Sequence, residues 1–179
     1  TSISYMHHPL LPSLLTYGFV DASYGNQPDT MRSGLGSVFF INGGYILSNI
    51  GVTKCTVPSV AEAEFIALAD ASSECIGLIN ILKEIGYEIK KPVIYSDSSA
   101  AVTSILSKSV TQMLKHIKIR FHTIRDRVLQ EEDFEISHIA GKSNFADPFT
   151  KLITNRKDFS ESMDRIMNGV GFDSMVGHY

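Results

Sequence analysis

The sequence is short of residues that would assign it to several common classes of protein. It has no tryptophan and only two cysteines among 179 residues. Cys55 and Cys75 are too few for a disulfide framework, and they do not have the spacing of a structural metal site. We therefore expect a reducing compartment, with both thiols buried as small apolar side chains.

Long uninterrupted hydrophobic runs are also missing. The longest apolar stretches are broken by Glu, Asp or Lys within a few positions, so the sequence predicts no membrane-spanning segment and no membrane partner. Residues 1–9, TSISYMHHP, have neither the basic start nor the apolar middle of a signal peptide. They also lack an initiator methionine, which leads us to expect a piece of a longer protein.

The net charge of −3 argues against a strongly basic nucleic-acid-binding protein. Positive charge is nevertheless concentrated between residues 108 and 127, where only Asp126 opposes it. The basic residues of this stretch are Lys108, Lys115, Lys118, Arg120, Arg125 and Arg127. Such a stretch can bind a phosphate backbone, and a solvated helix face explains it equally well.

Hydrophobic periodicity predicts the element order β-β-β-α-β-α-α-β-α within one domain at residues 17–153. The expected strands are 17–23, 36–41, 45–50, 93–96 and 134–138, and the expected helices are 59–85, 98–106, 113–130 and 145–152. Asn42-Gly43-Gly44 predicts a hairpin turn, and Ser59 predicts the N-cap of the first helix. Antiparallel strands followed by βα crossovers indicate an α/β fold with a mixed sheet. Residues 1–16 are expected to be a linker, and 154–179 a tail with an amphipathic helix at 156–167.

Four carboxylates stand at the ends of these core elements. Asp21 and Asp97 end two strand-like runs, Glu64 lies on the first long helix, and Asp147 opens the last short helix. Taken singly, each has an ordinary explanation: Asp97 is more often a helix N-cap, Asp147 suits a first helical turn, and Asp21 suits an exposed strand face. Glu62 and Glu64 point about 200° apart on a helix, so only one faces the sheet. Since Glu62 suits the cap, we expect Glu64 to point inward.

Gathered by the fold, the four acids would form a negative cluster that needs a cation. Mg²⁺ prefers all-oxygen sites shared with a phosphate substrate, so metal-dependent phosphodiester hydrolysis is the leading hypothesis. His138 ends the last strand and could transfer protons near such a site. The sequence has no glycine-rich phosphate loop followed by a helix and no nucleophile elbow.

An ordered set of motifs from about residue 17 to 152 resembles the ribonuclease H domain of copia-type LTR retrotransposon polyproteins. The motifs are GFVDA (18–22), RSGLGSVFFINGG (32–44), SVAEAEFIAL (59–68), IYSD (94–97), KHIKIRFHTIR (115–125) and NFADPFTK (144–151). Any single motif would be weak, but the ordered set is specific. The resemblance implies a ribonuclease H-like fold with a five-stranded mixed sheet whose first three strands are antiparallel.

The resemblance also implies an endonuclease that cuts the RNA strand of RNA–DNA hybrids. On that basis Asp21, Glu64, Asp97 and Asp147 would hold two Mg²⁺ ions, with Mn²⁺ as a substitute, and His138 would assist turnover. The implied nucleic-acid-binding residues are Lys115, His116, Lys118, Arg120, Arg125 and Asn144. The implied partners are the hybrid and an adjacent reverse transcriptase, and the implied location is a cytoplasmic virus-like particle or the nucleus.

Two alternatives stay open. A non-catalytic nucleic-acid-binding or interaction module could retain the same fold, although it would gain nothing from clustered carboxylates beside a phosphate backbone. An integrase of the same superfold would use three acids, and the fourth acid and the histidine speak against it.

Overall fold

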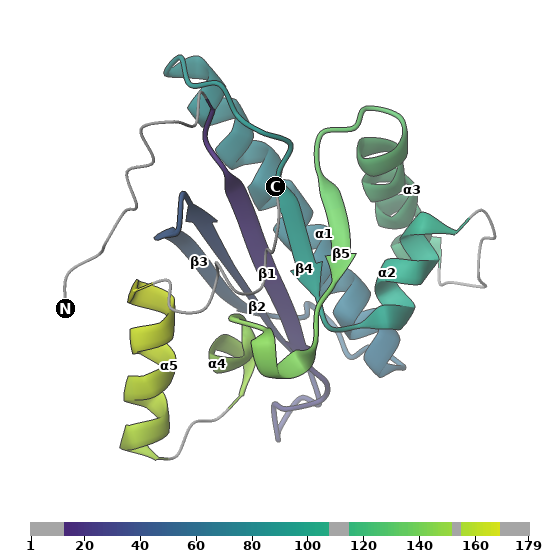
Figure 1. Cartoon of the computed structure of the whole chain (residues 1–179). Helices are drawn as coiled ribbons and strands as arrows, with labels where there is room; N and C mark the ends of the chain where they lie inside the picture. The colour runs from purple at the N-terminus through teal and green to yellow at the C-terminus, as the bar shows by residue number, and fades with distance from the viewer. Residues whose placement is uncertain (1–12, 108–114, 152–154, 169–179) are drawn as a thin grey trace.

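The computed structural model describes residues 13–107, 115–151 and 155–168, with the backbone alone at 115–118. These residues form a five-stranded sheet with helices on both faces (Figure 1). The strands are β1 (Thr16–Ser23), β2 (Gly34–Ile41), β3 (Gly44–Val52), β4 (Val93–Ser96) and β5 (Glu135–His138). The helices are α1 (Val60–Glu84), α2 (Ser99–Leu106), α3 (Lys115–Leu129), α4 (Asp147–Thr150) and α5 (Arg156–Asn168), with one 3₁₀ turn, η1 (Gly141–Ser143). The predicted order of elements is confirmed.

The sheet is mixed, as predicted. Its strand order is β3-β2-β1-β4-β5, with β1, β2 and β3 antiparallel and with β4 parallel to both β1 and β5. The β2–β3 hairpin turns at Asn42 and Gly43, whose φ angles are 47° and 83°. Asparagine and glycine tolerate this left-handed backbone best, so the turn residues dictate the hairpin. The parallel pairing of β1 and β4 brings their carboxyl ends to one edge of the sheet.

Alternating residues of the central strands divide the core into two layers. Val20 and Phe39 belong to the layer under α1, α2 and α3, whereas Phe19 and Phe40 belong to the layer under α4 and α5. Ile166 of α5 is 2% exposed within that second layer. The predicted amphipathic helix near the C-terminus is therefore packed against the sheet (Figure 1).

Helix α1 is the long core helix of the first layer. The Ser59 hydroxyl accepts a hydrogen bond from the Glu62 backbone N–H at 3.2 Å, which confirms the predicted N-cap. By length and apolar composition alone α1 could cross a membrane, so the prediction that no segment could do so was wrong. In this fold 56% of its most apolar window is buried, and core packing accounts for its composition.

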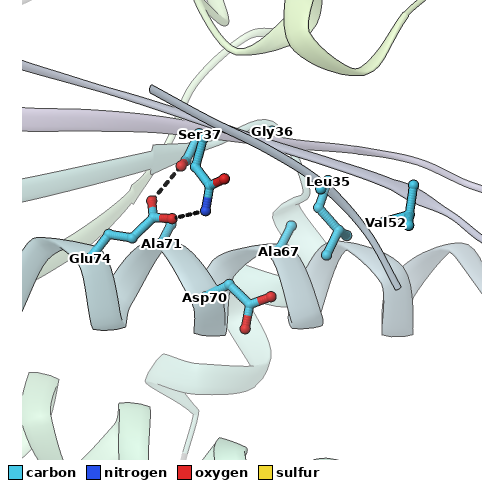
Figure 2. Close-up of a pocket in the computed structure, with 10 residues that line it drawn as sticks. Leu35, Gly36, Ser37, Val52, Ala67, Asp70, Ala71 and Glu74 are labelled. Carbon is cyan, nitrogen blue, oxygen red and sulfur yellow. Dashed lines mark hydrogen bonds between the residues drawn. The ribbon is translucent and has the colours of Figure 1, made fainter. Parts of the chain in front are cut away.

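A small hollow of about 80 Å³ lies between α1 and the β2–β3 side of the sheet (Figure 2). Glu74 reaches across it from α1, accepting hydrogen bonds from the Ser37 hydroxyl at 2.5 Å and from the Asn49 side-chain amide. The carboxylate thus ties the helix to β2 and to the edge strand β3. Both Glu74 oxygens are engaged in these bonds, so the residues around the hollow serve to join α1 to the sheet.

The two cysteines differ from each other. Cys75 is fully buried, and burial raises the pKa of its thiol to about 12. Cys55 is exposed, so the prediction that both thiols are buried is wrong for this one. Cys55 lies outside the strands and helices, in the connection between β3 and α1, where no periodic pattern marks an inward side.

Candidate active site

Three aspartates from distant parts of the chain meet at the carboxyl edge of the sheet. Asp21, Asp97 and Asp147 each offer a carboxylate oxygen, and these three oxygens lie within 4.8 Å of one another. Asp21 is on β1, Asp97 directly follows β4, and Asp147 is the first residue of α4. The last β1–β4 register pair is Val20 with Ser96, so Asp21 and Asp97 both stand one residue beyond it. Parallel pairing alone therefore brings these two side by side.

Asp97 takes part in this cluster, and the residue after it caps the following helix. The Ser98 hydroxyl accepts a hydrogen bond from the Ala101 N–H at 3.3 Å, which makes Ser98 the N-cap of α2. The interpretation of Asp97 as an N-cap is therefore wrong. The backbone of Gly141 closes over the carboxylate, since a Cβ there would lie 3.1 Å from Asp97 Oδ2.

Asp21 is 3% exposed and is held by α4. The Thr150 hydroxyl donates a hydrogen bond to Asp21 Oδ2. Burial raises the pKa of Asp21 to about 6 against the effect of that bond, and the charges of Asp147 and Asp97 add to the rise. Gly36, paired with Asp21 across the β1–β2 ladder, allows α4 to approach, because a Cβ there would lie 2.8 Å from Thr150 Cγ2.

Glu64 lies beside the three aspartates without joining the set within 4.8 Å. It is 9% exposed, as the helical geometry predicted. Burial raises the pKa of Glu64 to about 8, with Asp21 and Asp97 contributing and a backbone hydrogen bond with Ala22 opposing. Glu64 Oε2 is buried and has no hydrogen-bond partner among the described residues.

Lys151 supplies a positive charge to the cluster. Its Nζ lies 2.7 Å from Asp147 Oδ2, four residues earlier on the chain. Partial burial disfavours the ammonium, but the hydrogen bond to Asp147 and the charges of Asp147, Asp21 and Asp97 raise the pKa of Lys151 overall. Sequence reasoning assigned no role to Thr150 or Lys151. Thr150 and Lys151 follow Asp147 by three and four residues, and this spacing in the sequence indicates side chains close to Asp147.

The donor set fits divalent cations. It consists of carboxylate oxygens, the ligands that Mg²⁺ and Mn²⁺ prefer, and it includes two buried oxygens without partners, Glu64 Oε2 and Asp147 Oδ1. Burial is the main cause of the raised pKa values of Asp21 and Glu64, and the neighbouring carboxylates raise these values further. A bound cation would relieve both the repulsion and the missing contacts.

Asn144 and His138 border the aspartates. Asn144 is 3% exposed, and its amide donates to the Val20 carbonyl at 2.9 Å and to Asp97 Oδ1 at 3.4 Å. His138 Nε2 lies 3.2 Å from the Asp97 carbonyl oxygen. A carbonyl oxygen only accepts, so Nε2 carries the proton of this hydrogen bond. The exposed imidazole thus stands at the rim of the cluster.

The basic residues predicted to bind nucleic acid lie on α3. Lys115, His116 and Lys118 belong to its first turn, and their side chains lie outside the described part of the structure. Arg120 pairs with Asp70 of α1 at 2.9 Å, and Arg125 lies over the Phe121 ring at 5.9 Å. Their contact with nucleic acid remains a prediction.

Comparison with known proteins identifies relatives among transposon polyproteins. No protein-family model matches the chain. The Pol polyprotein of transposon TNT 1-94 from Nicotiana tabacum is 33% identical over 140 residues, which are 78% of this chain and 10% of the relative. The Ty1-NL2 Gag-Pol polyprotein of Saccharomyces cerevisiae is 31% identical over 170 residues, covering 86% and 9%. The chain thus spans about a tenth of the length of these curated relatives.

Solved structures share the fold. LC11-RNase H1, isolated from compost by a metagenomic approach, aligns with a TM-score of 0.58 and 15% identity, covering 86% of this chain and 99% of that one. A second structure of that protein, in complex with RNA/DNA hybrid, aligns with a TM-score of 0.56 and 16% identity, covering 75% and 92%. RNase H1 from Halobacterium salinarum NRC-1 aligns at 0.53 and 16%, covering 83% and 97%. The predicted ribonuclease H fold is confirmed.

Proposed function

Since the chain is a ribonuclease H-fold domain of a copia-type LTR retrotransposon polyprotein, we propose that it is an endonuclease that hydrolyses the RNA strand of RNA–DNA hybrids. The observation that carries the proposal is the meeting of Asp21, Asp97 and Asp147 at one edge of the sheet. Buried Glu64 adds a fourth acid, whose pKa is raised first by burial and then by the charges of Asp21 and Asp97. A module that only bound nucleic acid would be weakened by this charge.

The four acids would hold two divalent cations, Mg²⁺ or Mn²⁺, on Asp21, Glu64, Asp97 and Asp147. When bound, such ions lower the pKa of an attacking water and stabilise the charge on the leaving oxygen. Thr150 keeps the Asp21 carboxylate aimed at the cluster, and Asn144 does the same for Asp97. These two hydrogen bonds hold the ligand oxygens in place before substrate arrives, which is the preorganisation that hydrolysis requires.

His138 would handle the proton. Its Nε2–H is directed to the Asp97 backbone carbonyl, so Nδ1 is the ring nitrogen that would exchange a proton. From the rim of the cluster Nδ1 would take up a proton released by the attacking water and then give it to the leaving 3′ oxygen, or the ring would assist the departure of product. The product would be RNA ending in a 5′ phosphate.

Binding of the hybrid would depend on the basic face of α3 together with the adjacent reverse transcriptase. Lys115, His116, Lys118, Arg120 and Arg125 would contact phosphates, which position the duplex without reading its sequence. The net charge of −3 makes the 179-residue chain a weak polyanion binder alone, so the neighbouring domain would supply much of the affinity. The polyprotein context would place this reaction in a cytoplasmic virus-like particle or the nucleus, with 17–153 as the catalytic domain.

Cleavage of a labelled RNA–DNA hybrid tests the proposal. Asp97→Asn keeps the Oδ1 acceptor of Asn144 but removes one negative charge, and we expect it to abolish cleavage while the circular dichroism spectrum stays unchanged. Glu84→Gln is the matched control, because Glu84 lies about 30 Å along α1 from Glu64. This variant should cleave the hybrid as the wild type does. Equal activity of Asp97→Asn and wild type would refute the assigned site. Inactivity of every variant and of the wild type would favour a binding module.

A further inference from the structure

A second cavity opens directly beside the aspartate cluster. It has a volume of about 130 Å³ and lies between α5 and the η1–α4 segment. Gly141, Lys142, Asn144 and Asp147 line one side, and Ser162 and Arg165 of α5 line the other. Asp147 therefore belongs both to the cluster and to the wall of this cavity, so the two spaces adjoin.

The exposed side chain of Arg165 lies over an aromatic ring in this wall. Its guanidinium carbon lies 4.9 Å from the centre of the Phe145 ring. Stacking holds the plane of the guanidinium while its N–H edges stay available. Arg120 and Arg127 are both paired with acids, but within residues 13–107, 115–151 and 155–168 no acid pairs with Arg165.

The stacking partner also links Arg165 to the segment that carries Asn144. Phe145 directly follows Asn144, whose amide donates to Asp97 Oδ1 and to the Val20 carbonyl. Arg165 is therefore positioned relative to the aspartates through one buried loop. A guanidinium that stacks on a ring in this way can orient a ligand as well as attract it.

Two further donors complete the cavity. Ser162 precedes Arg165 by three residues, so both side chains lie on the same face of α5. Lys142 is exposed on η1, and the described residues contain no acid within ion-pair distance of it. The one acid in the wall, Asp147, is already paired with Lys151 at 2.7 Å. A guanidinium fork, an ammonium and a hydroxyl are the donors that recognise a phosphate group.

We propose that Lys142, Ser162 and Arg165 form a subsite for a backbone phosphate of the strand that is cut, next to the phosphate held at the aspartates. This inference rests on the proposed function. Because the cavity shares Asp147 with the cluster, its phosphate belongs to the same strand as the scissile phosphate, within one or two nucleotides. Its role is to hold the strand in register over the carboxylates, so it acts on binding more than on the chemical step.

Binding measured separately from cleavage tests the subsite. In the Asp97→Asn background, which leaves the hybrid uncut, we expect Arg165→Gln and Lys142→Gln each to raise the Kd for hybrid about tenfold, the loss of one charge-assisted contact. Each should also reduce the slope of log K against log salt by about one. Lys157→Gln is the control on the same helix, since Lys157 faces Glu161 instead of the cavity, and it should leave both values unchanged. Lys142 is exposed and lies outside the core, so weaker binding by Lys142→Gln would not be a result of misfolding.

A neutral phosphate provides the coupling test. A methylphosphonate placed at successive positions of the RNA strand should weaken binding at one position near the cut, and Arg165→Gln should remove that particular sensitivity. The subsite is overturned if Arg165→Gln binds the hybrid as Lys157→Gln does. It is also overturned if the loss of binding free energy caused by Arg165→Gln adds in full to the loss caused by a methylphosphonate at every position. The two proposals fail separately: hybrid cleavage without this coupling refutes the subsite alone, and coupling without cleavage by the wild type refutes the nuclease alone.

Discussion

Replacing Glu64 by Gln should stabilise the metal-free protein. Burial, with Asp21 and Asp97, raises the pKa of Glu64 from 4.5 to about 8, so the folded state binds this proton more tightly than the unfolded state. Stability from this group is therefore present below pH 4.5 and is lost as the pH rises toward 8. A gap of this size corresponds to about 4 kcal/mol at pH 8, where the folded protein is still half protonated at Glu64. Local relaxation and water entry reduce the measurable part, and we expect a gain of about 2–4 kcal/mol for Glu64→Gln.

Urea denaturation in EDTA at pH 5 and pH 8 measures this gain. The Gln side chain can still accept the Ala22 backbone hydrogen bond, so the substitution removes charge with little change in shape. The gain should be large at pH 8 and small at pH 5, where wild-type Glu64 is mostly protonated. Mg²⁺ should narrow the difference at pH 8, because a ligand that binds only the folded wild type stabilises it by mass action.

Glu62→Gln is the matched control on the same helix. Glu62 lies in the first turn of α1, where a negative charge favours the helix, so its loss should cost a few tenths of a kcal/mol. The electrostatic account of the cluster is wrong if Glu64→Gln gains nothing at pH 8, or gains equally at both pH values.

Three further substitutions test the supports of the cluster. Thr150→Val removes the hydrogen bond to Asp21 and should weaken Mg²⁺ binding about tenfold in calorimetry, whereas Thr150→Ser should retain it; equal affinities would refute a positioning role. Lys151→Gln removes the charge paired with Asp147 and should cost up to about 1 kcal/mol of metal-free stability at pH 8, since the pair is half exposed. The same substitution should tighten Mg²⁺ binding. Weaker Mg²⁺ binding would count against Lys151 as a counter-charge. Gly36→Ala places a methyl 2.8 Å from Thr150 Cγ2 and 2.9 Å from Phe149 Cβ, so the unfolding free energy should fall by about 1–3 kcal/mol; an unchanged value would show that α4 moves freely.

Much of the fold could be predicted because local signals agreed with the tertiary structure. Asn42 and Gly43 tolerate positive φ and mark the hairpin, and Ser59 caps α1 where its pattern of apolar residues begins. The inward direction of Glu64 followed from helical geometry alone. Each of these signals acts within a few residues, where the sequence is directly informative.

The remaining features depend on contacts between distant segments. Asp97 and Ser98 are adjacent, and either could cap α2. The fold places the Asp97 carboxylate beside Asn144 and the other aspartates, and Ser98 is the cap. Thr150 meets Asp21 across 129 positions of sequence, so no local pattern marks that bond. In the sequence Arg165 is one charge on an amphipathic helix, and only the folded structure places it over the Phe145 ring.

The central claim is that the clustered acids support cation-dependent hydrolysis of one strand of a hybrid. The most direct measurement uses a hybrid with differently labelled RNA and DNA strands, incubated with the wild-type protein in EDTA and after addition of Mg²⁺. We predict that the RNA strand alone is cut, only after Mg²⁺ is added, with 5′ phosphate on the new ends. Cleavage in EDTA, cleavage of the DNA strand, or an intact RNA strand at saturating Mg²⁺ would contradict the claim.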